Sequence, residues 1–156
     1  MELHEVQVDT VASASLPWQE TLVMPLGDIQ LGAEGCDEDK LRRYIEWGIE
    51  RKAYFLGMGD YVDVASPSNR QAIRSAHVYD SVEDALEEAA DSAVQRFLKL
   101  TKGTEGRWLG MLEGHHYYEF QDGTTSDTRI AQALKAPFLG NCAFLRLRFA
   151  GRSTSQ

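Results

Sequence analysis

Three short apolar runs divide the chain into segments that have the length and composition of buried β-strands. They occupy residues 21–27, 53–58 and 107–113 and are built mainly from Leu, Val, Met, Tyr, Phe and Trp. Nearly continuous apolar runs of this length are typical of strands that are covered on both faces, as in a parallel sheet flanked by helices. We therefore expect these runs to form the strands of one parallel sheet.

Helical periodicity occupies the segments between and after these runs. Asp37 can cap a helix that runs to about Lys52, and a longer helix is expected from the capping-box sequence at Ser81 to about Leu100. A short third helix is predicted at about 126–135. The inward positions of the first helix are predicted to be Leu41, Tyr44, Ile45, Gly48 and Ile49, and those of the second Val82, Leu86, Ala89, Ala93, Phe97 and Leu100. The order strand–helix–strand–helix–strand predicts an α/β fold with a mostly parallel sheet and covering helices.

The two ends of the chain differ from this pattern. Residues 1–20 alternate only weakly, so they are interpreted as an N-terminal arm or an edge strand. Residues 142–149 alternate strictly from Phe144 onward, which predicts a half-exposed antiparallel strand with Arg146 and Arg148 on its wet face. This strand is expected to begin a second sheet.

Composition indicates one ordinary domain, which we assign to residues 21–156. The chain has 156 residues, of which 43% are hydrophobic and 26% charged. No apolar run approaches the ~20 residues that span a bilayer, and the acidic N-terminus is unlike a signal peptide. We therefore expect a cytoplasmic protein that does not bind membranes. The net charge of −8 argues against a surface for nonspecific nucleic-acid binding.

Chemically reactive side chains follow each of the three apolar runs. The segments are Gly27-Asp28-Ile29-Gln30, Gly59-Asp60-Tyr61-Val62-Asp63 and Gly114-His115-His116. Ligands of open α/β sheets bind beyond the carboxyl ends of the strands, where these segments are expected to converge. Carboxylates can bridge two divalent cations, and histidine can bind a metal or donate a proton. The pattern predicts a catalytic metal site.

The order of these segments resembles the motifs of the calcineurin-like metallophosphoesterase superfamily, over about residues 21–118. The resemblance implies a four-layer α/β/β/α sandwich that holds two divalent metal ions and hydrolyses phosphomonoesters or phosphodiesters. It implies that Asp28 binds the first metal, that Asp60 bridges both and that His116 protonates the leaving group. Manganese is the metal expected first, with iron, zinc and magnesium as alternatives.

Several positions depart from the family pattern. Gln30 stands where the family has a metal-binding histidine, and His115 stands where it has an asparagine ligand; both side chains can still ligate a metal. Tyr117 replaces the acid that orients the catalytic histidine, so Asp63 or Glu119 is the candidate for that role. Arg70 is a weaker candidate for contact with a phosphate, with surface charge as the default interpretation.

The later histidine motifs of the family have no counterpart here, since no histidine follows His116. Either the protein is degenerate, or the chain is the N-terminal portion of a longer enzyme whose sandwich is incomplete in these residues; we favour the second interpretation. It predicts weak metal binding and slow turnover by the chain alone. Micromolar binding of two manganese ions with full phosphodiesterase activity would contradict it.

Metal-dependent phosphoesterase is thus the leading functional hypothesis. A catalytically degenerate binding or scaffold module is the alternative, and the altered residues Gln30 and Tyr117 are what it would predict. A nucleotide-binding α/β domain of another kind is a weak third, because the glycine-rich phosphate motifs are missing. The substrate stays open, since nucleases, nucleotide phosphodiesterases and protein phosphatases would share these motifs. The sequence predicts no oligomeric state.

Overall fold

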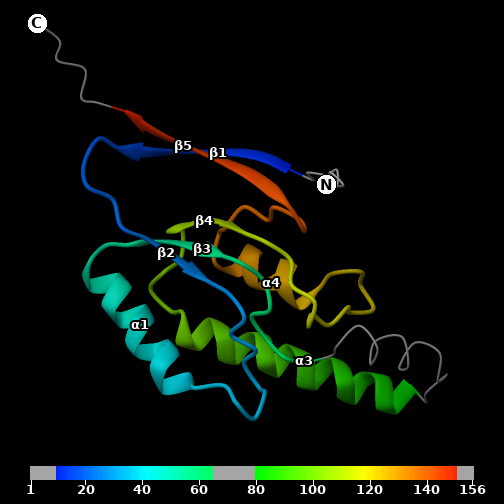
Figure 1. Cartoon of the computed structure of the whole chain (residues 1–156). Helices are drawn as coiled ribbons and strands as arrows, with labels where there is room; N and C mark the ends of the chain where they lie inside the picture. The colour runs from blue at the N-terminus through cyan, green and yellow to red at the C-terminus, as the bar shows by residue number, and fades with distance from the viewer. Residues whose placement is uncertain (1–9, 65–79, 151–156) are drawn as a thin grey trace, which may run out of the picture.

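The computed structural model describes residues 10–64 and 80–150, which form a mixed α/β structure (Figure 1). In chain order the elements are β1 (Thr10–Pro17), β2 (Val23–Leu26), α1 (Glu38–Glu50), β3 (Tyr54–Gly57), α3 (Asp80–Leu100), β4 (Trp108–Met111), α4 (Ser126–Ala133) and β5 (Ala143–Ala150). All of the predicted strands and helices are present, each shorter than or shifted slightly from its predicted range.

A three-stranded parallel sheet forms the centre of the molecule, as the apolar runs predicted. Its order is β2-β3-β4, with Val23 opposite Tyr54 and Phe55 opposite Trp108. The rings of Phe55 and Trp108 are 5.2 Å apart across this pair, and both residues are buried. The α/β fold with a parallel sheet is therefore confirmed, whereas the four-layer α/β/β/α sandwich stays a prediction.

Helix α1 packs closely on the sheet. Asp37 caps it by accepting a hydrogen bond from the backbone N–H of Lys40, as predicted. Leu41, Ile45 and Gly48 are its buried residues. A Cβ at Gly48 would come within 3.0 Å of the Phe55 ring, so glycine at this position lets the helix approach the sheet.

The buried stripe of α3 differs from the predicted one. Val82 is 42% exposed and Ala89 is exposed, whereas Ala90, Val94 and Phe97 are buried. Phe97 is confirmed as an inward residue, and Leu86, Ala93 and Leu100 are partly buried against the core, as predicted. The prediction is wrong at Val82 and at Ala89, because the neighbouring alanines at 89 and 90 do not distinguish the two faces. The side chain of Ser81, the predicted cap, lies outside the described residues.

The second sheet has two strands, and its direction corrects the sequence prediction. Strand β5 was expected to be antiparallel, but it pairs parallel to β1, with Thr10 opposite Ala143 and Pro17 opposite Ala150. Alternation of apolar and polar residues shows only that one face of a strand is exposed to solvent. It does not show in which direction the partner strand runs. The exposure of Arg146 and Arg148 is confirmed.

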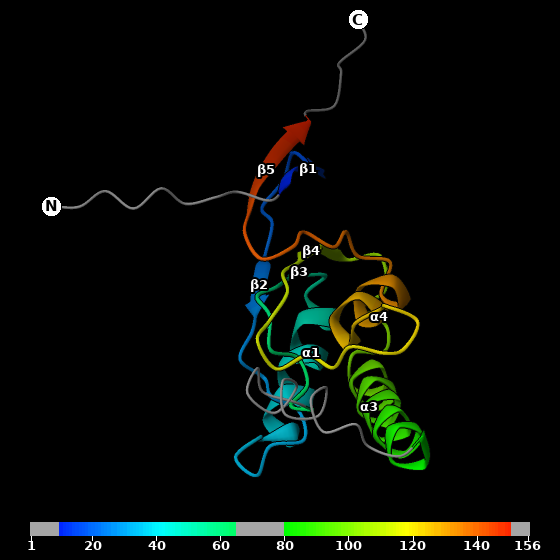
Figure 2. The ribbon, with the colours of Figure 1, turned by 90° about the vertical axis from the view of Figure 1, so that its right-hand side faces the viewer.

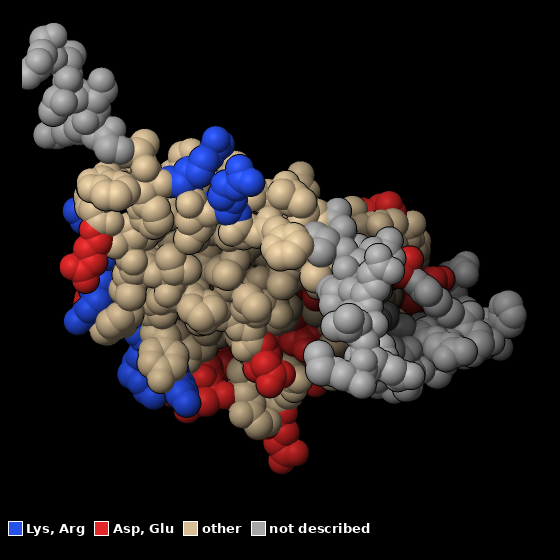
Figure 3. Space-filling model, turned by 45° about the horizontal axis from the view of Figure 1, so that its top comes forward, with Lys and Arg blue, Asp and Glu red and all other residues tan. Residues whose placement is uncertain are grey.

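The three-stranded sheet lies between the helices and the β1–β5 pair. Figures 1 and 2 both show α1 and α3 on one side of β2-β3-β4 and the β1–β5 pair on the other. On the side of the β1–β5 pair, Figure 3 shows a broad surface with few charged side chains. Exposed apolar residues of this pair and of the turn after β1 are Val11, Trp18, Phe144 and Phe149. Among the described helices, none is long and apolar enough to cross a membrane.

Candidate active site

The three strand-end segments meet, as their positions in the sequence predicted. The first lies along the second, because the backbone N–H groups of Ile29 and Gln30 both donate to the carbonyl of Asp60, at 2.9 Å each. The N–H of Leu31 donates to the carbonyl of Tyr61 at 3.1 Å. Backbone hydrogen bonds therefore hold the Asp28 and Asp60 segments together beyond the ends of β2 and β3.

The third segment contacts the second through two glycines. A Cβ at Gly59 would lie 2.8 Å from the Cα of Gly114, and a Cβ at Gly114 would overlap the backbone nitrogen of Asp60. Gly59 also has a φ of 89°, which L side chains rarely adopt. Only glycine allows the backbone after β3 and the backbone after β4 to approach so closely.

The carboxylate of Asp60 lies at the junction of these segments. Its Oδ1 accepts hydrogen bonds from the backbone N–H groups of both His115 and His116, the latter at 3.1 Å. One carboxylate oxygen thus holds the loop that carries both histidines. The sequence predicted Asp60 as the central residue of the site, and the structure gives it this additional contact with the third segment.

His116 pairs with Asp63. Its Nδ1 lies 2.8 Å from Oδ1 of Asp63, and both side chains are about one-third exposed. Of the two acids predicted as candidates to orient His116, Asp63 therefore makes this contact. Glu119 lies farther along the loop, where its backbone bridges to Thr125. A carboxylate on one ring nitrogen can fix the orientation of a histidine and leave the other nitrogen for chemistry.

Asp28 and Gln30 are joined to each other. The side-chain amide of Gln30 donates a hydrogen bond to Oδ1 of Asp28 at 2.8 Å. Both residues, like Asp60, have left-handed backbone conformations, with φ values of 53°, 48° and 54° respectively. Only two other non-glycine residues in the described ranges share this conformation, Lys52 and Lys135. Each directly follows the C-cap residue of a helix. Such strain is concentrated at functional sites.

The candidate ligands have side chains of the kinds that bind divalent ions, but they are not grouped around one point. Carboxylate and amide oxygens from Asp28, Asp60 and Gln30, with imidazole from His115, are suitable ligands for divalent ions. Residues 10–64 and 80–150 nevertheless contain no group of three or more His, Cys, Asp or Glu side chains arranged to hold one ion. Asp28, Asp60 and His115 are therefore not arranged as such a group.

Asp127 is a residue at this site that the sequence analysis missed. It lies in the first turn of α4, is 1% exposed and accepts a hydrogen bond from the N–H of Gly114 at 2.8 Å. Burial raises the pKa of its carboxyl to about 6, opposed by the hydrogen bonds from Gly114 and Ser126. The only sequence signal was its place beside the N-cap Thr125, which is typical of an ordinary helix start.

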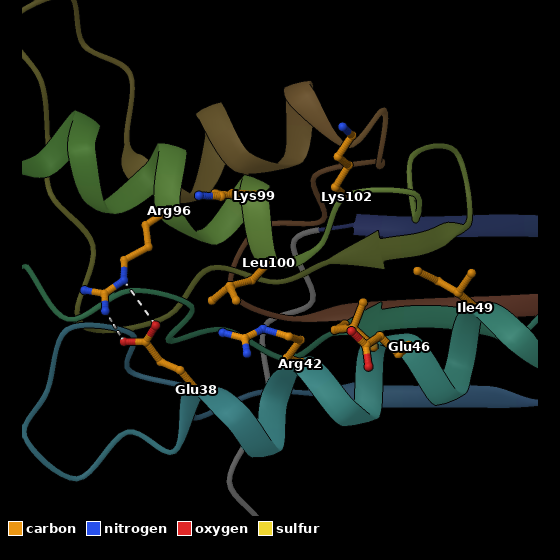
Figure 4. A pocket seen from close by; sticks show the side chains of 9 residues that line it. Glu38, Arg42, Glu46, Ile49, Arg96, Lys99, Leu100 and Lys102 are labelled. Carbon is orange, nitrogen blue, oxygen red and sulfur yellow. Dashed lines mark hydrogen bonds and ion pairs between the residues drawn. The ribbon is translucent and has the colours of Figure 1, made fainter.

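Two other features lie apart from these segments. Arg70, the weaker candidate for contact with a phosphate, is outside the described residues. A groove of about 450 Å³ separates α1 from α3, and none of the candidate site residues lines it. Figure 4 shows Arg96 and Glu38 pointing toward each other across one end of this groove, where the Arg96 Nε donates to a Glu38 oxygen at 3.1 Å.

Comparison of the chain with protein-family models, with curated proteins and with solved structures finds no match.

Proposed function

We propose that this chain carries the core of a metal-dependent phosphoesterase active site. The observation that carries the proposal is the pairing of His116 with Asp63 beside Asp60, whose carboxylate holds the histidine loop. An oriented histidine beyond the strand ends, where ligands of α/β sheets bind, is suited to general acid catalysis. The left-handed backbone at Asp28, Gln30 and Asp60 adds support.

In this function His116 is the general acid. Asp63 binds its Nδ1, so Nε2 is the ring nitrogen that would give a proton to a phosphoester oxygen. Asp60 keeps the His116 backbone in place. Asp28, Gln30, Asp60 and His115 are the residues that would hold divalent metal, with manganese as the first choice. When bound, such ions lower the pKa of a water molecule and neutralise phosphoryl charge.

A binding or scaffold module without catalytic activity is the second candidate. Two observations favour it. Residues 10–64 and 80–150 contain no group of three or more His, Cys, Asp or Glu side chains arranged to hold one ion, and the Gln30 amide already occupies one oxygen of Asp28. Under the enzyme proposal these same observations predict weak metal binding and slow turnover by the chain alone.

A metal-binding and hydrolysis experiment separates the two. The metal-free protein is titrated with Mn²⁺ by isothermal calorimetry, and hydrolysis of bis-p-nitrophenyl phosphate is followed with excess metal. Asp60→Asn and His116→Gln are compared with Asp84→Asn, which removes an exposed acid from α3. We expect Asp60→Asn to weaken Mn²⁺ binding and both site variants to lower kcat by about 10²-fold or more, with Asp84→Asn unchanged.

Two results would count against the enzyme. Absence of hydrolysis at saturating Mn²⁺, Zn²⁺ and Mg²⁺ favours the binding module. Hydrolysis that survives both Asp60→Asn and His116→Gln places the reaction outside the three segments and contradicts the proposal.

A further inference from the structure

The loop that carries His115 and His116 is attached at both ends to the start of helix α4. At its first end, the N–H of Gly114 donates to Oδ2 of Asp127 at 2.8 Å. At its second end, the N–H of Tyr118 donates to Oγ of Ser126 at 3.1 Å. The two acceptors are consecutive residues, so a single rigid turn of helix holds residues 114–118.

These contacts are buried and form a closed network. Ser126 is fully buried and Asp127 is 1% exposed. The backbone N–H of Ser126 donates back to the carbonyl of Tyr118 at 2.9 Å, and the Ser126 hydroxyl donates to Oδ1 of Asp127 at 3.3 Å. A buried carboxyl is expensive to keep in a protein, and hydrogen bonds of this kind offset only part of the cost. Helix stability alone does not require it, because the N-cap of α4 is supplied by Thr125.

The network acts on the histidines through the backbone between its two ends. His115 and His116 lie inside the clamped segment, and their N–H groups bind Oδ1 of Asp60. Gly114 has no room to move toward Asp60, since even a Cβ there would overlap the Asp60 backbone. The segment is therefore held from one side by α4 and from the other by Asp60.

We propose that Ser126 and Asp127 are positioning residues that fix the His115–His116 loop against Asp60, so that His116 meets Asp63. The relevance to catalysis rests on the proposed phosphoesterase function; the positioning itself does not. Asp127 acts here as a hydrogen-bond acceptor for Gly114, a role that an asparagine side-chain oxygen can also fill.

The test compares Asp127→Ala with Asp127→Asn in the full chain. Thr125→Ala is the control, because it removes the helix N-cap without touching either end of the loop. Hydrogen exchange of the Gly114 and His116 amides and the ring resonances of His116 are measured by NMR without metal. We expect Asp127→Ala to speed Gly114 exchange by about tenfold or more and to shift the His116 ring signals. In Asp127→Asn, the exchange rate of the Gly114 amide and the His116 ring signals should stay close to those of the wild type.

Activity supplies a separate readout. If the wild-type chain hydrolyses a phosphodiester, Asp127→Ala should lower kcat more than it changes KM, and Asp127→Asn should recover most of kcat. If the wild type is inactive, the function proposed above fails while the NMR comparison still decides the positioning role. Should Asp127→Ala not fold, Ser126→Ala replaces it, with faster exchange of the Tyr118 amide expected.

Two outcomes would overturn the inference. One is a His116 ring signal that does not move in Asp127→Ala or in Ser126→Ala. The other is an equal change in Thr125→Ala, which would mean that the loop responds only to the stability of α4.

Discussion

The buried carboxyl of Asp127 should make the free energy of unfolding fall as pH rises. Its pKa is raised from 3.8 to about 6, mainly by burial and further by the nearby charges of Glu113 and Asp60. Between these two values the folded protein keeps the proton and the unfolded chain releases it. The unfolded state then binds fewer protons than the folded state, so the free energy of unfolding falls as pH rises. Asp127→Asn removes the titrating group and keeps the shape of the side chain.

The size of the effect follows from the shift. A change of about 2 pKa units corresponds to about 3 kcal/mol, of which about 2 kcal/mol falls between pH 4.5 and pH 7.5. Urea unfolding of the wild type and Asp127→Asn, without metal, gives the free energy of unfolding at each pH. The difference between the two proteins isolates this group, because the other carboxyls titrate in both.

The control is Asp122→Asn. The pKa of Asp122 is lowered, first by hydrogen bonds from Thr124 and then by Arg129, so its contribution has the opposite sign and is lost as pH falls. Asp122 is exposed, and its removal should leave the fall in the free energy of unfolding toward high pH intact. The reasoning would be refuted if the free energies of unfolding of the wild type and Asp127→Asn differed by the same amount at every pH from 4.5 to 7.5. Asp127 would then ionise as an ordinary carboxyl.

Three further substitutions test the packing around the site, each by the free energy of unfolding from urea denaturation. Gly114→Ala should destabilise by at least about 2 kcal/mol, because its Cβ overlaps the Asp60 backbone; a neutral effect would mean that the loops lie farther apart. Tyr61→Phe should cost about 1–2 kcal/mol through loss of its 2.7 Å hydrogen bond to a backbone carbonyl, and no cost would show that water replaces the hydroxyl. Arg129→Ala should cost about 1 kcal/mol, because its guanidinium lies 3.3 Å from the centroid of the Phe120 ring and also pairs with Asp91 and Asp122; an unchanged stability would mean that these contacts together contribute no net energy.

The convergence of the three segments was predictable because it follows from topology. Apolar runs identified β2, β3 and β4, and parallel strands bring their carboxyl ends to one edge of a sheet. The direction of β5 was not predictable in the same way. Its partner, β1, lies more than 120 residues earlier in the chain, and β1 is built from small residues that give a weak pattern.

The partners of the site residues were harder to predict than the residues themselves. The contact between His116 and Asp63 depends on how two loops turn after their strands, which spacing does not fix. Asp127 was missed for a related reason. An acid in the first turn of a helix ordinarily interacts with the helix dipole, and only burial against Gly114 distinguishes this one. Residues defined by their neighbours in space leave little trace in a single sequence.

The backbone carries most of the contacts that bring the three segments together. Ile29, Gln30 and Asp60 are joined by backbone groups, and the histidine loop is held by several of its backbone N–H groups in addition to the ring contact of His116 with Asp63. Side chains at positions 30, 115 and 117 can therefore vary without moving the segments. Under the proposed function, these side chains would affect which metal binds and how tightly, and not whether the segments meet. A site of this construction can lose its catalytic activity in evolution while it keeps its shape, which is why metal binding and hydrolysis have to be measured separately.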